Sequence, residues 1–152
     1  MFPTLDDFRI KFSNFDLGNP WNILRLICGL FLFPHVVGKF AGLGLNPLIV
    51  AFFVKAGFHP PEIWVCLAAA AETACGVALT LGICTRFAAA GATALLLGTV
   101  YALQMAKGFG WTWNTGGYEY PVFWALVCLS VAINAWKQEF SARPLRFAQT
   151  AH

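Results

Sequence analysis

The sequence is poor in charged residues. Only 11% of its 152 residues are Asp, Glu, Lys or Arg, whereas 59% are hydrophobic and the mean hydropathy is +0.66. Soluble domains carry roughly 25% charged residues, and a 16.6 kDa globule has too much surface for its volume to bury this apolar content in one core. The composition therefore argues against a soluble enzyme. It also excludes a disordered chain, because disorder requires low hydrophobicity.

The charge balance and the cysteine pattern exclude further classes. Ten cations against seven anions give a net charge of +3, which is too small for a nucleic-acid binder. Disulfide frameworks and zinc sites need clustered cysteines, and this sequence has no Cys-x-x-Cys pair. No metal site is therefore predicted. Each cysteine sits in or beside an apolar run, where a thiol packs as a small hydrophobe; the five are Cys28, Cys66, Cys75, Cys84 and Cys128.

Four apolar runs are long enough to cross a bilayer, whose hydrocarbon core takes about 20 helical residues. Backbone polar groups in lipid must bond within their own segment, so each run is predicted to be a helix. The N-terminus lacks the basic region of a signal peptide, which predicts that the first run is a retained span. The predicted spans are 21–40, 62–83, 86–105 and 120–136. The expected fold is an all-α, polytopic membrane protein, a four-helix transmembrane bundle with one domain over residues 1–152.

Three shorter segments are predicted to lie near the membrane surface. Leu5–Phe15 has apolar residues at helical spacing among charged ones, which predicts a peripheral amphipathic helix. Asn46–Gly57 is apolar but too short to span, so we expect an interfacial or re-entrant helix between spans one and two. Lys107–Tyr118 combines glycines with tryptophans, which is typical of an ordered loop at the aromatic belt.

The cations near the span ends predict the orientation. Seven of the ten fall on the side of the N-terminus and three on the other side. Because cytoplasmic loops of membrane proteins carry an excess of Lys and Arg, both termini are predicted to be cytoplasmic. The expected location is the inner (cytoplasmic) membrane, with lipid as the first partner.

Ionisable residues inside the predicted spans are the first candidates for function, because a charge at mid-bilayer is costly unless it is paired or faces a cavity. Glu72 lies near the centre of span two, and Arg25 lies about one turn inside span one. We predict that these two residues pair and form the catalytic centre, with Arg86 as the alternative partner of Glu72. A protonated carboxyl, a structural ion pair, or an Arg86 that only reaches the membrane surface are the plainer alternatives.

A second group of polar and aromatic residues is expected at the other end of the spans. One face of span one carries Arg25, Cys28, Leu32, His35 and Lys39 and is predicted to face inward. Aromatic walls with a few hydrogen-bond donors suit a quinone headgroup, and a buried carboxyl such as Glu72 could carry its protons. The predicted ligand-binding residues are His35, Lys39, Tyr101, Gln104, Trp111, Trp113, Tyr118 and Glu119. Arg86 and Asn134 are predicted to belong to a structural polar core.

Three segments of the sequence resemble the DoxX family of small bacterial and archaeal membrane proteins. They are LRLICGLFLFPHVVGKF (Leu24–Phe40), ETACGVALTLGICTRFAA (Glu72–Ala89) and TGGYEYPVFWAL (Thr115–Leu126). The resemblance implies a four-helix inner-membrane protein, with Arg25, Glu72, Arg86 and Glu119 as the shared polar core. Some relatives are linked to oxidoreductase assemblies, among them a thiosulfate:quinone oxidoreductase with a DoxD membrane subunit, and others to oxidative stress, thiol balance or aromatic-compound metabolism.

Three hypotheses of function follow. The leading one is a membrane subunit of a quinone-linked oxidoreductase or redox complex, with quinone as a non-covalent cofactor and a redox partner protein as the electron donor. The residues offer no motif for a flavin, a haem or an iron–sulfur centre, so the partner or direct quinone chemistry would have to supply the redox step. The alternative is a non-enzymatic scaffold or small-solute carrier, which at this length would need to form a homo-oligomer. The third and weakest is metal handling by His35, His59 and Cys66, whose spacing fits no known ligand pattern.

Overall fold

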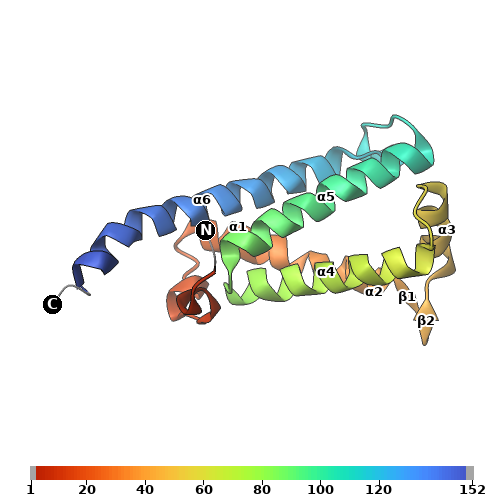
Figure 1. The fold of residues 1–152 in the computed structure, drawn as a ribbon. Coiled ribbons are helices and arrows are strands. Elements are labelled where there is room, and N and C mark those ends of the chain that lie inside the picture. Colours follow the sequence, from red (N-terminus) through yellow and green to blue (C-terminus); the bar gives the residue numbers. More distant parts are fainter. Residues whose placement is uncertain (1–2, 150–152) are drawn as a thin grey trace.

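Long helices packed side by side make up the protein. The computed structural model describes residues 3–149, with side chains described for residues 3–141. In Figure 1, α5 and α6 run alongside each other, α4 runs along α1 and α2, and α3 lies across one end. The elements in chain order are η1 (Leu5–Phe8), η2 (Phe12–Phe15), α1 (Pro20–Leu30), α2 (Leu32–Gly38), β1 (Phe40–Ala41), β2 (Gly44–Leu45), α3 (Pro47–Lys55), α4 (Pro61–Leu81), α5 (Thr85–Lys107), η3 (Trp113–Thr115) and α6 (Glu119–Gln149).

The four predicted spans are confirmed. Four helical stretches in the described part of the chain are long and apolar enough to cross a membrane: Pro20–Gly38, Pro61–Leu81, Thr85–Lys107 and Glu119–Ser141. Three of them match the predicted ranges within a few residues. The fourth helix, α6, continues well beyond the predicted end at residue 136. The residues that follow are more polar, but they are still helical.

The first span is broken into α1 and α2 at Phe31. Pro34 explains the break, because a proline has no N–H to donate to the carbonyl four residues earlier, and its ring clashes with that carbonyl. The affected carbonyl belongs to Leu30, the last residue of α1. The chain then resumes as α2, so that the two short helices together act as one span.

A pair of glycines lets α1 and α4 approach closely. A Cβ atom on Gly29 would lie 2.8 Å from the backbone nitrogen of Thr80, and one on Gly76 would lie 3.2 Å from the carbonyl oxygen of Gly29. Membrane helices use such small residues for backbone-to-backbone packing. The contact fixes the depth of α1 against α4, and therefore which polar side chains meet.

The core between the helices is small and closely packed. Cys28 and Cys128 are 1% and 0% exposed and lie in the same buried cluster as Leu79 and Trp124. All five cysteines are free, and none of the described residues forms a disulfide. The prediction that the cysteines pack as hydrophobes holds for the buried pair, whereas Cys66 is exposed on α4.

The prediction of one peripheral amphipathic helix over Leu5–Phe15 is wrong. The segment forms two short 3-10 helices, η1 and η2, because its polar side chains bind elsewhere. The Asp7 carboxylate accepts a hydrogen bond from the backbone N–H of Thr4 and pairs with Arg86, and the Asn14 amide reaches the carbonyls at the end of α4. These contacts fasten the segment to the bundle, although Leu5 and Phe12 still project outward.

The predicted short helix is present at the opposite end. Helix α3 lies within the predicted segment Asn46–Gly57, and the Asn46 side chain caps it by accepting a hydrogen bond from the N–H of Leu48 at 3.0 Å. A two-stranded hairpin, β1 and β2, precedes it with Phe40 opposite Leu45. In the loop between α5 and α6, a Cβ on Gly117 would lie 2.5 Å from the Gly110 carbonyl oxygen, so only glycine fits there.

Candidate functional site

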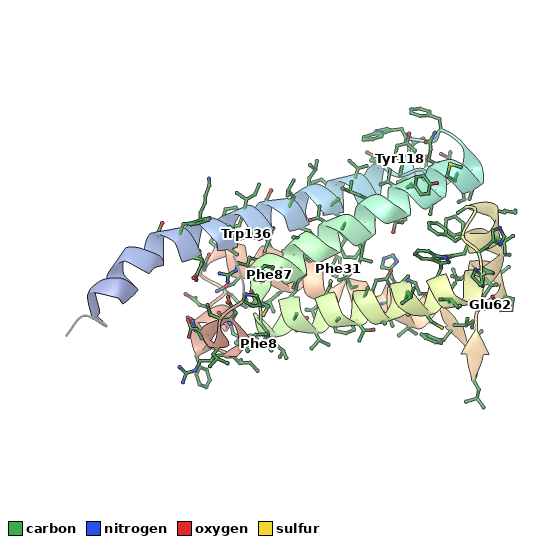
Figure 2. The ribbon with its side chains drawn as sticks, viewed as in Figure 1. Phe8, Phe31, Glu62, Phe87, Tyr118 and Trp136 are labelled. Carbon is green, nitrogen blue, oxygen red and sulfur yellow. The ribbon has the colours of Figure 1, made fainter. Side chains whose placement is uncertain are left out.

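Polar side chains gather at both ends of the bundle. We call the end that carries α3 and the α5–α6 loop the loop end, and the end that carries η1 and η2 the N-terminal end. Figure 2 labels Glu62 and Tyr118 at the loop end and Phe8 at the N-terminal end. Each end has its own pocket, so the predicted site residues fall into two groups.

An ion pair between Lys39 and Glu72 lies toward the loop end. The Lys39 ammonium is 2.6 Å from the Glu72 carboxylate, and the two side chains are only 10% and 13% exposed. Lys39 also donates to the carbonyl oxygen of His35 at 3.2 Å. This pair joins the end of the first span to the middle of α4. It gives a counter-charge to the carboxylate of Glu72, which was predicted to lie deep in the membrane.

The predicted pairing of Glu72 with Arg25 is wrong, and so is the alternative with Arg86. The Arg25 guanidinium donates instead to the carbonyls of Leu79, Thr80 and Asn14. The reason is depth: Leu79 lies seven residues beyond Glu72 in α4, which is about 10 Å along a helix. Arg25 therefore stabilises the carbonyl end of α4, and the two residues predicted to be catalytic are far from direct contact.

His35 sits between the ion pair and an aromatic row. Its ring is within electrostatic reach of Glu72 and Lys39, and its centroid is 5.5 Å from that of Trp124. Unlike its neighbours on the same face, His35 is exposed. The predicted inward face of the first span is thus confirmed for Arg25 and Lys39, while the imidazole lies at the open edge of the helices.

An aromatic pocket of about 500 Å³ opens beside α6 at the loop end. Three of the predicted ligand-binding residues lie in its wall. The Glu119 carboxylate accepts a hydrogen bond from the backbone N–H of Trp113 at 3.3 Å. The wall residues, which define what we call the aromatic pocket, are Trp111, Trp113, Glu119, Tyr120, Phe123 and Leu126.

A row of rings leads from this pocket into the bundle. The rings of Trp113 and Tyr120 are 5.2 Å apart, and those of Tyr120 and Trp124 are 5.8 Å apart. Trp124 in turn contacts His35. Sequence reasoning missed Trp124, although its position one turn after Tyr120 on the same helix would have pointed to it.

Three predicted ligand-binding residues lie elsewhere. Tyr101 packs against Phe58 at 6.1 Å and is 52% exposed. Gln104 is exposed. Tyr118 packs edge-on against Phe109 and Trp111 inside its own loop. None of the three lines the aromatic pocket. Tyr101 and Gln104 lie on the outer half of α5 and are turned away from the interior, whereas the Tyr118 ring is held inside its loop.

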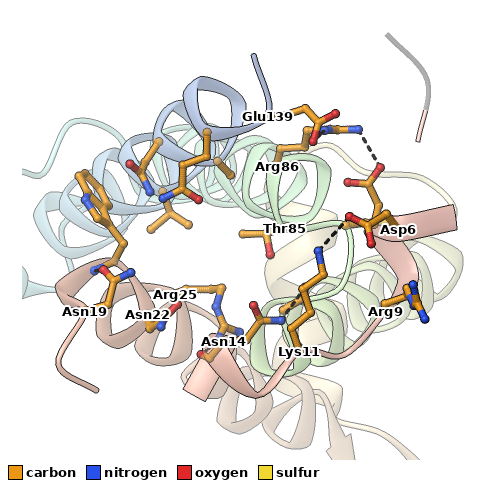
Figure 3. Close-up of a pocket in the computed structure, with 18 residues that line it drawn as sticks. Asp6, Arg9, Lys11, Asn14, Asn19, Asn22, Arg25, Thr85, Arg86 and Glu139 are labelled. Carbon is orange, nitrogen blue, oxygen red and sulfur yellow. Dashed lines mark hydrogen bonds and ion pairs between the residues drawn. The ribbon is translucent and has the colours of Figure 1, made fainter. Parts of the chain in front are cut away.

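A second pocket, of about 270 Å³, lies at the N-terminal end and is shown in Figure 3. Its wall joins η1, η2 and the start of α1 to α6 and to the turn between α4 and α5. The members of this polar pocket are Asp6, Asp7, Arg9, Lys11, Asn14, Asn19, Trp21, Asn22, Arg25, Gly82, Cys84, Thr85, Arg86, Val131, Asn134, Ala135, Gln138 and Glu139. Arg25, Arg86 and Asn134, all predicted as polar-core residues, thus meet at one pocket.

Arg86 binds side chains from several different segments around this pocket. Its guanidinium lies 2.8 Å from the Asp7 carboxylate and 3.4 Å from that of Glu139, and its side chain is 3% exposed. It also stacks over the Phe87 ring. Asp7 and Glu139 were not predicted as site residues. Asp7 lies 79 positions from Arg86, so only the tertiary structure brings them together.

The thiol of Cys84 also lines the polar pocket. Burial and the negative charge of Asp7 raise the pKa of this thiol above its ordinary value, against an opposing effect of the Arg86 guanidinium. Cys84 has a φ of 45°, an unusual left-handed conformation for a residue other than glycine. Among the residues that the structure describes, no group of three His, Cys, Asp or Glu side chains could hold a metal ion.

Comparison with known proteins shows to which family this helical membrane bundle belongs. The family model DoxX matches residues 21–105, which run from α1 to near the end of α5. The chain therefore belongs to the DoxX family, and the predicted family membership is confirmed. No curated protein and no solved structure matches the chain.

Proposed function

We propose that this DoxX protein is the membrane subunit of a quinone-linked oxidoreductase, and that the quinone headgroup binds in the aromatic pocket. The observation that carries the proposal is the composition of that pocket: four aromatic residues and one carboxylate around a volume of about 500 Å³. Ligand pockets of this size are mostly apolar, with a few polar groups that fix orientation.

The pocket residues fit a quinone ring. Trp113, Tyr120 and Phe123 offer flat apolar faces to the ring, and aromatic pairs gain about 0.5–1.5 kcal/mol beyond the burial of their area. Glu119 offers the carboxylate at the wall, where it can hold a proton for a quinone oxygen. A bound quinone would accept two electrons and two protons.

The neighbouring residues would form the inner boundary of the pocket. The row from Trp113 through Tyr120 and Trp124 ends at His35, which lies beside the Lys39–Glu72 pair. The row of aromatic rings does not conduct protons, so in this proposal Glu119 exchanges the protons of the quinone with water, and the Lys39–Glu72 pair holds the helices behind the pocket together. In this proposal a separate redox protein supplies the electrons.

We also propose that the N-terminal end faces the cytoplasm and that the protein lies in the inner membrane. Four cations, Arg9, Lys11, Arg25 and Arg86, line the polar pocket at that end, which agrees with the positive-inside rule. A reporter that is active only in the periplasm, fused after His152, should give no signal. Strong activity of that fusion would reverse the orientation.

The second candidate is a non-enzymatic carrier or scaffold, and the polar pocket at the N-terminal end favours it. That pocket carries many polar groups without any redox cofactor motif. In this case the protein would bind a polar solute and would not respond to quinone. It would also need to form a homo-oligomer to make a continuous path across the membrane.

A fluorescence titration separates the two candidates. Purified protein in phosphatidylcholine nanodiscs is titrated with ubiquinone-1, which quenches tryptophan emission on contact. We expect saturable quenching in the wild type and a loss of roughly tenfold in affinity in Trp113→Ala, the equivalent of about 1.4 kcal/mol. Trp64→Ala is the matched control, because Trp64 is an exposed α4 residue outside the pocket. Equal quenching curves for the two variants would contradict the proposed site.

A further inference from the structure

We propose that the polar pocket at the N-terminal end binds a phosphate-type oxyanion, held by Arg25, Arg86 and the first backbone N–H groups of α5. The ligand class is a small phosphate ester, free in solution or as the headgroup of a phospholipid. This proposal is independent of the quinone site, which lies at the opposite end of the bundle.

The first element of the site is the start of α5. This helix of 23 residues begins at Thr85, and the side chain of its N-cap residue, Cys84, makes no capping hydrogen bond. The N–H groups of Thr85 and Arg86 have no hydrogen-bond acceptor among the described residues. The N-terminus of a helix carries partial positive charge and free N–H groups, which together favour an anion.

The second element is an unsatisfied donor on Arg86. Its two terminal nitrogens face Asp7 and Glu139, but its Nε is buried and has no hydrogen-bond partner in the described part of the chain. Buried donors are nearly always satisfied, and each exception calls for an explanation such as a ligand. Arg86 lines the polar pocket, and a small rotation of its buried side chain would turn this unsatisfied donor toward an oxygen atom bound there.

The third element is an excess of positive charge. The pocket wall carries four cations and three carboxylates. Asp6 pairs with Lys11, and Asp7 and Glu139 pair with Arg86. Arg25 is 4% exposed and hydrogen-bonds to main-chain carbonyls only, so within the described residues its charge has no carboxylate partner. A buried charge of this kind favours a bound anion.

The rest of the wall suits an ester better than a bare ion. A volume of about 270 Å³ has room for a phosphate group and a short polar extension. The side chains of Asn22, Asn134 and Gln138 contribute neutral amides to the wall, and these can hydrogen-bond with hydroxyl or ester oxygens. Figure 3 shows Asn22 and Arg25 on one side of the pocket, with Thr85 and Arg86 facing them across it.

The test measures binding in dodecyl maltoside micelles, which contain no phosphate group. Wild-type protein is titrated with glycerol 3-phosphate by calorimetry, with sodium chloride at equal ionic strength as the blank. We expect saturable binding. Asn134→Asp adds a carboxylate to the wall of the same pocket as the two guanidinium groups, so affinity should fall by roughly tenfold or more. Asn114→Asp is the matched control: it adds the same charge in the exposed loop at the far end, and binding should be unchanged.

Two results would overturn the proposal. One is the absence of saturable binding by the wild type, and the other is equal affinity in Asn134→Asp and Asn114→Asp. A thermal melt without ligand confirms that both variants are folded. Nanodiscs that contain phosphatidylglycerol identify the source of the anion: competition with glycerol 3-phosphate assigns the site to a lipid headgroup, and unchanged affinity assigns it to a soluble ester. Ubiquinone-1 quenching stays intact in Asn134→Asp if the quinone site is separate.

Discussion

The Lys39 ammonium lies 2.6 Å from the Glu72 carboxylate, and this ion pair joins the end of the first membrane span to the middle of the second. The two side chains are almost fully enclosed by the helices. A charge at this depth is tolerated because it is paired and because it is not turned toward lipid.

Glu72→Gln is expected to destabilise the fold, because it leaves the Lys39 ammonium buried without its counter-charge. A cost of about 3–5 kcal/mol is typical when one partner of a buried pair is removed. Lys39→Met should cost less, since the stranded carboxylate can take up a proton. Denaturant unfolding followed by circular dichroism measures both. Glu62→Gln, at the exposed start of α4, is the control and should leave the midpoint nearly unchanged.

Asp7→Asn is expected to loosen the N-terminal segment from the bundle. The substitution removes the carboxylate that pairs with the buried Arg86 and that accepts the hydrogen bond from Thr4. Loss of a hydrogen bond to a charged buried group costs about 1.5–3 kcal/mol. Asp6→Asn breaks an ion pair that is largely exposed, worth about 0–1 kcal/mol. Equal melting temperatures of the two variants would show that the segment is peripheral.

Gly29→Ala is expected to push α1 away from α4. The new Cβ would lie 2.8 Å from the Thr80 backbone nitrogen, which cannot move without shifting the helix, and such overpacking costs about 1–3 kcal/mol. Gly98→Ala meets nothing within 4 Å and should stabilise α5 by up to about 1 kcal/mol through helix propensity. Opposite shifts in the unfolding midpoint are therefore expected, and shifts of the same sign would refute the close contact.

Cys84 is expected to react slowly with maleimide near neutral pH. Burial and the negative charge of Asp7 raise the pKa of its thiol, so less of the reactive thiolate is present at neutral pH than for an ordinary cysteine. Asp7→Asn removes the negative charge, lowers this pKa and should raise the alkylation rate at a fixed pH. Mass spectrometry of the Cys84 peptide follows the rate, with Asp6→Asn for comparison. A slower reaction in Asp7→Asn would contradict the assigned electrostatics.

Much of the fold could be predicted from the sequence, because lipid imposes simple rules on composition and length. The spans and the short helix α3 follow from apolar run lengths alone. The break of the first span at Phe31 was not predicted, although Pro34 would have pointed to it. The two 3-10 helices could not be predicted, because Leu5–Phe15 has the periodicity of an amphipathic helix. The contacts of this segment with the distant residues Arg86 and Leu81 override that periodicity.

The candidate site was predicted less well, because partners of buried charges depend on the depth at which two helices cross. Glu72 was correctly expected to be paired inside the bundle. Its partner is Lys39 instead of Arg25, because the Gly29–Gly76 contact places Arg25 beside the carbonyls at the end of α4. The relative depth of two helices depends on backbone contacts of this kind, which cannot be read from the sequence.

Photoaffinity labelling with an azidoquinone tests the central claim most directly. Trypsin cleavage after Lys107 and Lys137 releases all six wall residues of the aromatic pocket on one peptide, residues 108–137. The account predicts that the label falls on this peptide, at or beside Trp113 and Tyr120, and that excess ubiquinone-1 abolishes the labelling. Label on other peptides, or labelling that excess ubiquinone-1 does not reduce, would contradict the quinone site.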